Sequence, residues 1–267
     1  MRSLAAFLLA AYVAGCSVSE PPVRTPADTP KIVSLNPCTD AVLARIAPPE
    51  QVLALSHYSR NPAGSSIPQA EARRYGVTGG TVEEVLALDP DVVVAGSFLP
   101  PATRAAFADL DIRIETFAIA RTVADSTAQV RRLGAIAGRD AEAVRIADRI
   151  EAAALPDLAG KRPNAVLWQP GGIVPGEGEL IDDLLARAGF TNHSAARGLD
   201  QASYLSLERV VADPPDVLLV AGDARAQRHP ALRAAPVMRV ERFDPSLLYC
   251  GGPTIIDAMA RLRNIRG

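Results

Sequence analysis

The chain has 267 residues, with 28 Lys and Arg against 30 Asp and Glu and a formal net charge of −2. This balance offers no basic excess of the kind that nucleic-acid binding requires. The length exceeds that of one typical domain, can bury a sizeable core, and fits two lobes better than one.

The N-terminus carries a predicted secretory signal. Arg2 precedes an apolar run from Leu4 to Val13 that is too short to span a bilayer, and the next residues lead to Cys16. The sequence Val-Ala-Gly-Cys at 13–16 resembles a bacterial lipobox, which implies cleavage before Cys16 and acylation of its thiol; the alternative is an ordinary signal peptide with an incidental cysteine. We expect residues 1–16 to be the signal and the proline-rich residues 17–30 to be a flexible tether. The mature protein would be anchored in the periplasm by lipid alone.

The first half of the body alternates predicted strands and helices. The expected strands are 31–35, 52–55, 91–95 and 112–117, and helices are expected near 39–47, 82–88 and 103–110. Thr39 or Asp40 is the predicted N-cap of the first helix. Strands separated by helices favour a mostly parallel sheet.

Two consecutive helices are predicted between the halves. The first begins near Val123 and ends at Gly138, and the second begins at Asp140 and runs to about Leu155. The second helix would be roughly 23 Å long at ~1.5 Å per residue, which is enough to join two lobes rigidly. We therefore expect an N-terminal lobe of residues 31–138, a connecting helix of residues 139–157 and a C-terminal lobe of residues 158–267.

The second half repeats a pattern of the first. Residues 82–94 and 207–219 both read as a short acidic helix, a Pro-Asp turn and a buried strand, so one kind of lobe is built twice. Two similar lobes usually leave a ligand cleft between them. The other elements expected here are strands at 165–168 and 237–242 and helices at 179–188 and 254–262, with an unassigned polar connection at 191–203.

Cys38 and Cys250 lie near opposite ends of the body. In an oxidising compartment they could form a disulfide. The alternative is two free thiols that face the cleft from opposite lobes as soft ligands for a metal or a metal complex. Both interpretations stay open from the sequence.

Candidate ligand contacts follow from the rule that open parallel sheets place their crevices at the carboxyl ends of the strands. Trp168 could cover a flat macrocycle with its apolar face, and core packing is its alternative role. The complete set of predicted contacts is Asn36, Pro37, Cys38, Tyr58, Arg60, Phe98, Trp168, Gly171, Tyr249 and Cys250. The three histidines show no ligand-spaced pair, so no site for a bare metal ion is predicted.

The order of these motifs resembles a known family. The opening residues 31–37, the repeated segments and the central helix are together similar to periplasmic binding proteins of cobalamin and iron-siderophore ABC importers. The resemblance implies an α/β fold of two doubly wound parallel-sheet lobes joined by a single long helix, with the ligand cleft between the lobes. Tyr58 matches an aromatic ligand contact of the cobalamin binders, and Glu83 and Glu208 match the glutamates that dock on the permease.

The resemblance also implies a function. The protein would be a monomeric solute-binding component, not an enzyme, that requires no cofactor of its own. It would capture a corrinoid or a ferric siderophore, with haem as a further candidate, and deliver it to an ABC permease and its ATPase. Three rivals are a zinc- or manganese-type ion binder of the same architecture, a periplasmic enzyme with Cys38 or Cys250 as nucleophile and His57 as base, and a purely structural lipoprotein.

Overall fold

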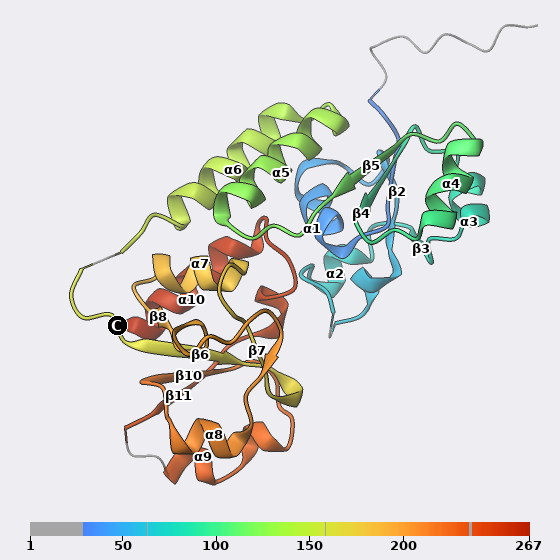
Figure 1. Cartoon of the computed structure of the whole chain (residues 1–267). Helices are drawn as coiled ribbons and strands as arrows, with labels where there is room; N and C mark the ends of the chain where they lie inside the picture. Colours follow the sequence, from blue (N-terminus) through green and yellow to red (C-terminus); the bar gives the residue numbers. More distant parts are fainter. Residues whose placement is uncertain (1–28, 63, 158, 235–236) are drawn as a thin grey trace, which may run out of the picture.

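The computed structural model describes residues 29–62, 64–157, 159–234 and 237–267. Cys16, the predicted signal and nearly all of the predicted tether lie outside these residues. The described chain forms two lobes that are joined along one side by helices (Figure 1). Over the described ranges, no helix combines the length and the apolar character that crossing a membrane requires.

The N-terminal lobe is built on a five-stranded sheet whose strands are all parallel. Its central strands are buried on both faces, because Ile32 and Val33 point to opposite sides and neither is exposed. In sheet order the strands are β3 (Val77–Thr78), β2 (Val52–Ser56), β1 (Ile32–Ser34), β4 (Val92–Gly96) and β5 (Ile114–Phe117), and the helices are α1 (Pro37–Ile46), α2 (Gln69–Ala72), α3 (Val82–Leu88) and α4 (Pro101–Asp109).

Helix α1 is capped three or four residues earlier than predicted. Its N-cap is Asn36, whose side-chain oxygen accepts hydrogen bonds from the backbone nitrogens of Cys38, at 2.8 Å, and Thr39. Pro37 occupies the first helical position, where a missing N–H costs nothing. The prediction of Thr39 or Asp40 as N-cap is therefore wrong, and both side chains are buried inside the lobe instead.

The C-terminal lobe is built on a four-stranded parallel sheet. In sheet order its strands are β11 (Arg239–Arg242), β10 (Val217–Val220), β6 (Asn164–Trp168) and β8 (Thr191–Asn192). A separate antiparallel pair, β7 (Ile173–Val174) with β9 (Ser203–Tyr204), was not predicted because its strands are too short to show a periodic pattern. The helices are α7 (Leu180–Arg187), α8 (Leu207–Ala212), α9 (Ala231–Ala234) and α10 (Thr254–Arg266).

The sequence repeat corresponds to equivalent structure in the two lobes. Asp91 precedes β4 and accepts a hydrogen bond from the backbone nitrogen of Lys31, at 2.7 Å, just before the paired strand β1. Asp216 precedes β10 and accepts one from the backbone nitrogen of Asn164, at 2.8 Å, at the start of the paired strand β6. The aspartate of each Pro-Asp turn therefore fixes the same strand pair in its own lobe.

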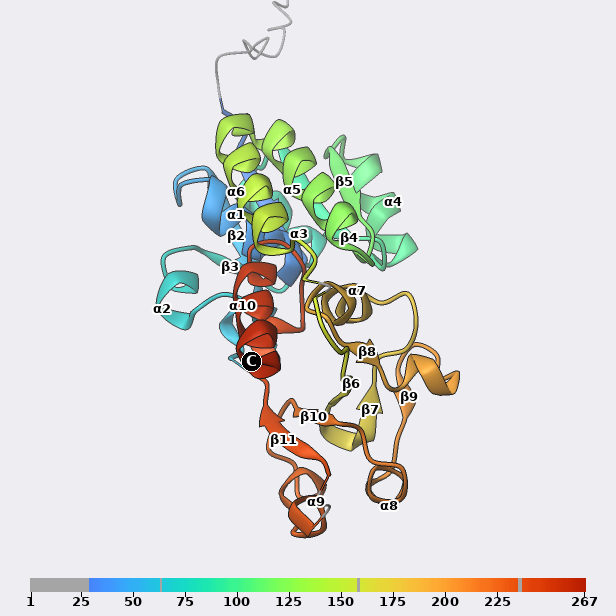
Figure 2. The same ribbon diagram turned by 90° about the vertical axis from the view of Figure 1, so that its left-hand side faces the viewer.

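A helical hairpin connects the lobes. Helix α5 (Val123–Ala137) ends at Gly138, whose φ of 62° is favoured by glycine, and α6 (Asp140–Ala153) returns beside it (Figure 2). Helix α5 contacts α1 of the first lobe and α7 of the second, while α6 contacts α1 and α10. The chain therefore passes between the lobes through α6. The connection is not a single helix, however, because α5 packs along α6 and also contacts both lobes.

Among the described residues, the buried apolar side chains form three clusters. The largest is shared by both lobes and runs through α1, the α5–α6 hairpin, α7 and α10. The two smaller clusters lie on the outer faces of the sheets, under α3 and α4 in one lobe and under α8 and α9 in the other. Because the inner core is continuous, moving the lobes apart would expose apolar surface to water, which opposes wide opening.

Candidate ligand cleft

A cavity of about 270 Å³ lies between the two lobes. The loops that follow β1, β4 and β5 line it from the N-terminal lobe, and the end of β6, the start of α7 and residues 248–252 line it from the C-terminal lobe. Its walls stand at the carboxyl ends of parallel strands, where sheets of this kind place their ligands. The cavity is the candidate functional site, and we call it the cleft.

Five of the predicted contact residues line this cleft. They are Asn36, Cys38 and Phe98 from the N-terminal lobe and Tyr249 and Cys250 from the C-terminal lobe. Phe98 is 80% exposed and Tyr249 is 40% exposed. Exposed aromatic rings on opposite lobes give the cleft broad apolar surfaces that are free to cover a flat ligand.

Tyr58 and Pro37 line a groove that adjoins the cleft. This groove has a volume of about 410 Å³ and shares Asn36, Gly96 and Phe98 with the cleft. The ring of Tyr58 lies against His57, with 4.0 Å between the ring centroids. Phe98 lines both the cleft and the groove. A ligand longer than the cleft could therefore extend past Phe98 and reach Tyr58.

The prediction that Trp168 contacts ligand is wrong. Its side chain is 1% exposed and packs in the outer cluster of the C-terminal lobe, where its indole nitrogen donates to the backbone oxygen of Leu205 at 2.8 Å. Successive residues of β6 point to opposite faces of the sheet. Leu167 and Gln169 therefore line the cleft, and Trp168 faces away from it.

Two other predicted contacts also lie outside the cleft. The guanidinium group of Arg60 donates to the backbone oxygen of Tyr75 at 2.8 Å, which turns it toward the edge strand β3. Gly171 lies in the turn after β6, with a φ of 78°, and is exposed without lining the cleft. Neither residue is placed to touch a ligand held between the lobes.

Several cleft residues were missed from the sequence. Ile119 and Arg121 follow β5, Gln129 lies on α5, and Glu179 precedes α7. The carboxyl-end rule also selects the first two, because they lie in the loop after β5, a strand that the sequence predicts at 112–117. Arg121 and Glu179 are the charged residues of the lining, and Glu179 already accepts a hydrogen bond from the backbone nitrogen of Gly176 at 2.9 Å.

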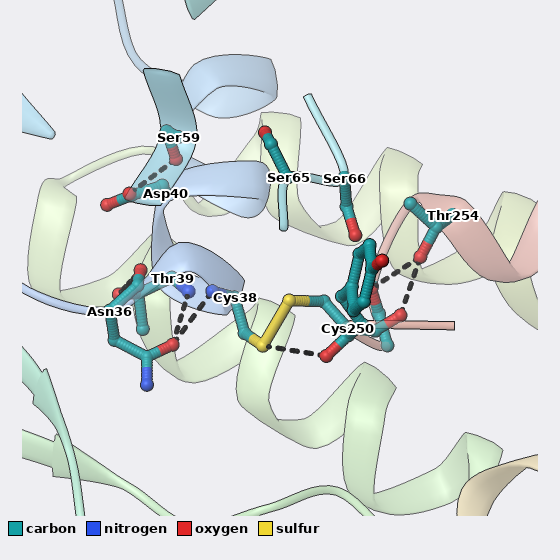
Figure 3. The surroundings of a disulfide bond; sticks show 12 residues. Asn36, Cys38, Thr39, Asp40, Ser59, Ser65, Ser66, Cys250 and Thr254 are labelled. Carbon is teal, nitrogen blue, oxygen red and sulfur yellow. Dashed lines mark hydrogen bonds between the residues drawn. A yellow bond between two sulfur atoms is a disulfide. The ribbon is translucent and has the colours of Figure 1, made fainter. Parts of the chain in front are cut away.

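Cys38 and Cys250 form a disulfide in the wall of the cleft, with their Cα atoms 5.0 Å apart (Figure 3). The structure therefore confirms the disulfide and not the pair of free thiols. Because both sulfur atoms are in the disulfide, neither is a thiolate that could ligate a metal or attack a substrate. In the part of the chain that the structure describes, no group of three or more His, Cys, Asp or Glu is arranged to hold a metal ion.

Asp40 is a fully buried carboxyl group beside the cleft wall. Its Oδ2 atom accepts hydrogen bonds from the backbone nitrogen of Ser56, at 3.0 Å, and from the hydroxyls of Ser56 and Ser59. Its Oδ1 atom has no hydrogen-bond partner among the described residues. Burial raises the pKa of Asp40 from 3.8 to about 7, although the serine hydrogen bonds act to lower it. The group ties α1 to the end of β2 and to the turn that carries His57 and Tyr58.

Glu83 and Glu208 occupy equivalent places in the two lobes. Each is exposed at the second position of a short helix, after an N-cap hydroxyl from Thr81 or Ser206. The neighbouring Glu84 differs, because its carboxylate accepts hydrogen bonds from Thr78 and from the backbone nitrogen of Gly79. Helices α3 and α8 lie at the outer ends of the lobes, away from the α5–α6 hairpin (Figure 1).

Comparison with known proteins identifies the family. Residues 32–237 match the periplasmic binding protein family, and the chain belongs to it. A cobalamin-binding protein of Halobacterium salinarum is 27% identical over 262 residues, an alignment that covers 88% of this chain and 68% of that protein.

Solved structures agree with the fold. The periplasmic haem-binding protein RhuT from Roseiflexus sp. RS-1 superposes with a TM-score of 0.71 at 22% identity, covering 90% of this chain and all of that one. The vitamin B12-binding protein BtuF of Vibrio cholerae gives a TM-score of 0.68 at 19% identity, with coverages of 88% and 96%. The two-lobed α/β fold is therefore that of periplasmic binding proteins.

Proposed function

We propose that the chain is the solute-binding component of an ABC importer and that its cleft captures a metal chelate. The observation that carries the proposal is a cleft between two similar lobes, faced by Phe98 on one side and Tyr249 on the other. Aromatic rings of this kind suit a flat, partly apolar ligand. Binding and handover need no covalent bond to form or break, so no enzymatic step is proposed.

The names of the related proteins suggest which chelates this cleft would bind. The Halobacterium salinarum relative is a cobalamin-binding protein, and the structures with the same fold include binders of haem and vitamin B12. A corrinoid or haem is therefore favoured, and a ferric siderophore is the remaining candidate. Since the described residues hold no cluster of metal-ligating side chains, the metal would arrive inside its chelate.

The proposed site of action is the periplasm, and the proposed anchor is an acyl group on Cys16. The sequence motif at 13–16 supports the anchor, and it lies outside the described residues. The proposed partners are an ABC permease and its ATPase, which a monomer of this chain would approach with Glu83 and Glu208. A carboxylate on each lobe can orient the protein over a permease that carries two matching cationic contacts.

Removal of the cleft aromatics should weaken chelate binding. Phe98→Ala and Tyr249→Ala should each raise the dissociation constant about tenfold for whichever of cyanocobalamin, haemin or a ferric hydroxamate the parent binds, because each removes a ring from the ligand surface. Absorption titration measures the constants. Tyr204→Ala is the matched control, since Tyr204 is 65% exposed on β9 and does not line the cleft.

The control variant should bind as the parent does. If the parent binds none of the three chelates, the proposed function is wrong. If it binds one of them and both cleft variants keep parental affinity, the ligand site lies elsewhere.

A further inference from the structure

Residues 246–252 of the C-terminal lobe reach across to the N-terminal lobe. We call this segment the strap. It runs between β11 and α10 and carries Tyr249 and Cys250. Residues 248–252 line the cleft, while Ser246 and Leu247 line a second groove of about 350 Å³. Leu247 and Leu248 pack against the shared core, so cavities border the strap only in part.

Three contacts tie the strap to the other side of the cleft. Cys250 is bonded to Cys38 at the start of α1, the backbone nitrogen of Gly252 donates to the hydroxyl of Ser126 on α5 at 2.6 Å, and the hydroxyl of Ser66 donates to the backbone oxygen of Ser246 at 2.9 Å. The disulfide is the covalent tie of the three and lies near the middle of the strap.

The approach of the strap to α5 is close enough to require glycine. A Cβ atom at Gly251 would lie 2.7 Å from the hydroxyl oxygen of Ser126, nearer than a real Cβ contact allows. The Sγ atom of Cys38 lies 3.4 Å from the backbone oxygen of Tyr249. The disulfide therefore holds Cys250 against the start of α1 (Figure 3). Tyr249, the neighbour of Cys250 in the chain, is exposed and lines the cleft.

We infer that the Cys38–Cys250 disulfide is a positioning element for the ligand, one that holds Tyr249 against the bound chelate and thereby slows its release. This inference rests on the proposed function of the cleft. A cross-link that orders the strap before binding removes an ordering cost from the bound state, and such preorganisation acts mainly on the dissociation rate. Without the disulfide, the strap would keep only two hydrogen bonds to the N-terminal lobe, from Gly252 to Ser126 and from Ser66 to Ser246, beside the packing of Leu247 and Leu248 on the core and the hydrogen bonds from Thr254.

The test compares the parent with a Cys38→Ser/Cys250→Ser variant. Both are full-length chains that also carry Cys16→Ser, so that the parent has two cysteines. Bound cyanocobalamin or haemin is displaced in a stopped-flow experiment, and hydrogen exchange is followed for the amides of residues 246–252. The variant should release the chelate about tenfold faster with a nearly unchanged association rate, and its strap amides should exchange faster.

Two further measurements keep the test decisive. If the double variant does not fold, the parent is measured before and after reduction by a phosphine, and the same acceleration is expected. Trp168→Phe serves as the control because it removes a buried hydrogen bond of the C-terminal lobe without touching the strap.

The outcomes separate this inference from the proposed function. Unchanged release and unchanged strap exchange without the disulfide would overturn the inference, even though the chelate binds. Equal acceleration in Trp168→Phe would also overturn it, since general destabilisation would then explain the effect. If the parent binds no chelate, the proposed function fails, and strap exchange alone decides whether the disulfide orders the strap.

Discussion

Reversal of the two proposed docking charges, Glu83→Lys with Glu208→Lys, should abolish import of the chelate by cells and leave the affinity of the purified protein unchanged. Each carboxylate is exposed on its own lobe. Hydrogen bonds from its own backbone nitrogen and from Ser206 hold the pKa of Glu208 below its ordinary range, so this group is ionised at neutral pH. Like charges placed against cationic contacts on the permease would oppose docking and remove its orientation.

Each single reversal should reduce uptake by about tenfold relative to the parent, because the glutamate of the other lobe could still contact the permease. The matched control is Glu50→Lys with Glu142→Lys, which makes the same change of net charge at exposed or half-exposed sites away from α3 and α8. Uptake of labelled chelate by cells and binding by the purified protein are both measured. Parental uptake by the docking variant would refute the role of the two glutamates, and so would loss of chelate binding.

Replacement of Asp40 by Asn should make the protein more stable at neutral pH and change the shape of its stability curve. The folded state raises the pKa of Asp40 from 3.8 to about 7 through burial. Between these values the unfolded chain has lost the proton while the folded protein keeps it, so the free energy of unfolding falls as the pH rises. Above about pH 7 the loss is complete and amounts to about 4 kcal/mol for this group.

Asn at position 40 can still accept the hydrogen bonds from Ser56 and Ser59 through its amide oxygen, but it carries no charge to desolvate. The stability difference between variant and parent should therefore grow from about pH 4 to about pH 7 and then level off. Urea unfolding across that range measures it, with Asp109→Asn, an exposed site on α4, as the control. A constant difference between the Asp40 variant and the parent would show that the carboxyl group is not held protonated.

Much of the fold could be predicted because the strands and helices carry clear apolar periodicity. The predicted strand at 165–168 agrees with β6 to within one residue, and the repeat at 82–94 and 207–219 corresponds to equivalent strand pairs. Helix α10 continues to Arg266, four residues beyond its predicted end, because Ile265 remains buried against the core. The short strands β7, β8 and β9 escaped prediction, since two residues cannot display a period.

The site was harder to predict than the fold. Leu167 and Trp168 both lie at the end of β6, so their positions in the sequence do not distinguish them. Side chains alternate between the two faces of a strand, and in the structure Leu167 is the one that faces the cleft. Arg60 was predicted to contact the ligand, but its guanidinium group donates a hydrogen bond to a backbone carbonyl of its own lobe. The pairing of Cys38 with Cys250 depends on how two distant lobes approach each other, which no local pattern records.

The most direct test of the central claim is native mass spectrometry, combined with an absorption spectrum, of the protein isolated from its own cells. The expected result is one corrinoid or haem per chain, or failing these one ferric siderophore, released on unfolding, together with a mature mass that begins at an acylated Cys16. A mature mass without lipid would refute the anchor and leave the cleft proposal standing. A protein that carries no chelate from its own periplasm, and takes none up when corrinoid, haem and ferric siderophore are supplied, would contradict the claim that this cleft holds a metal chelate.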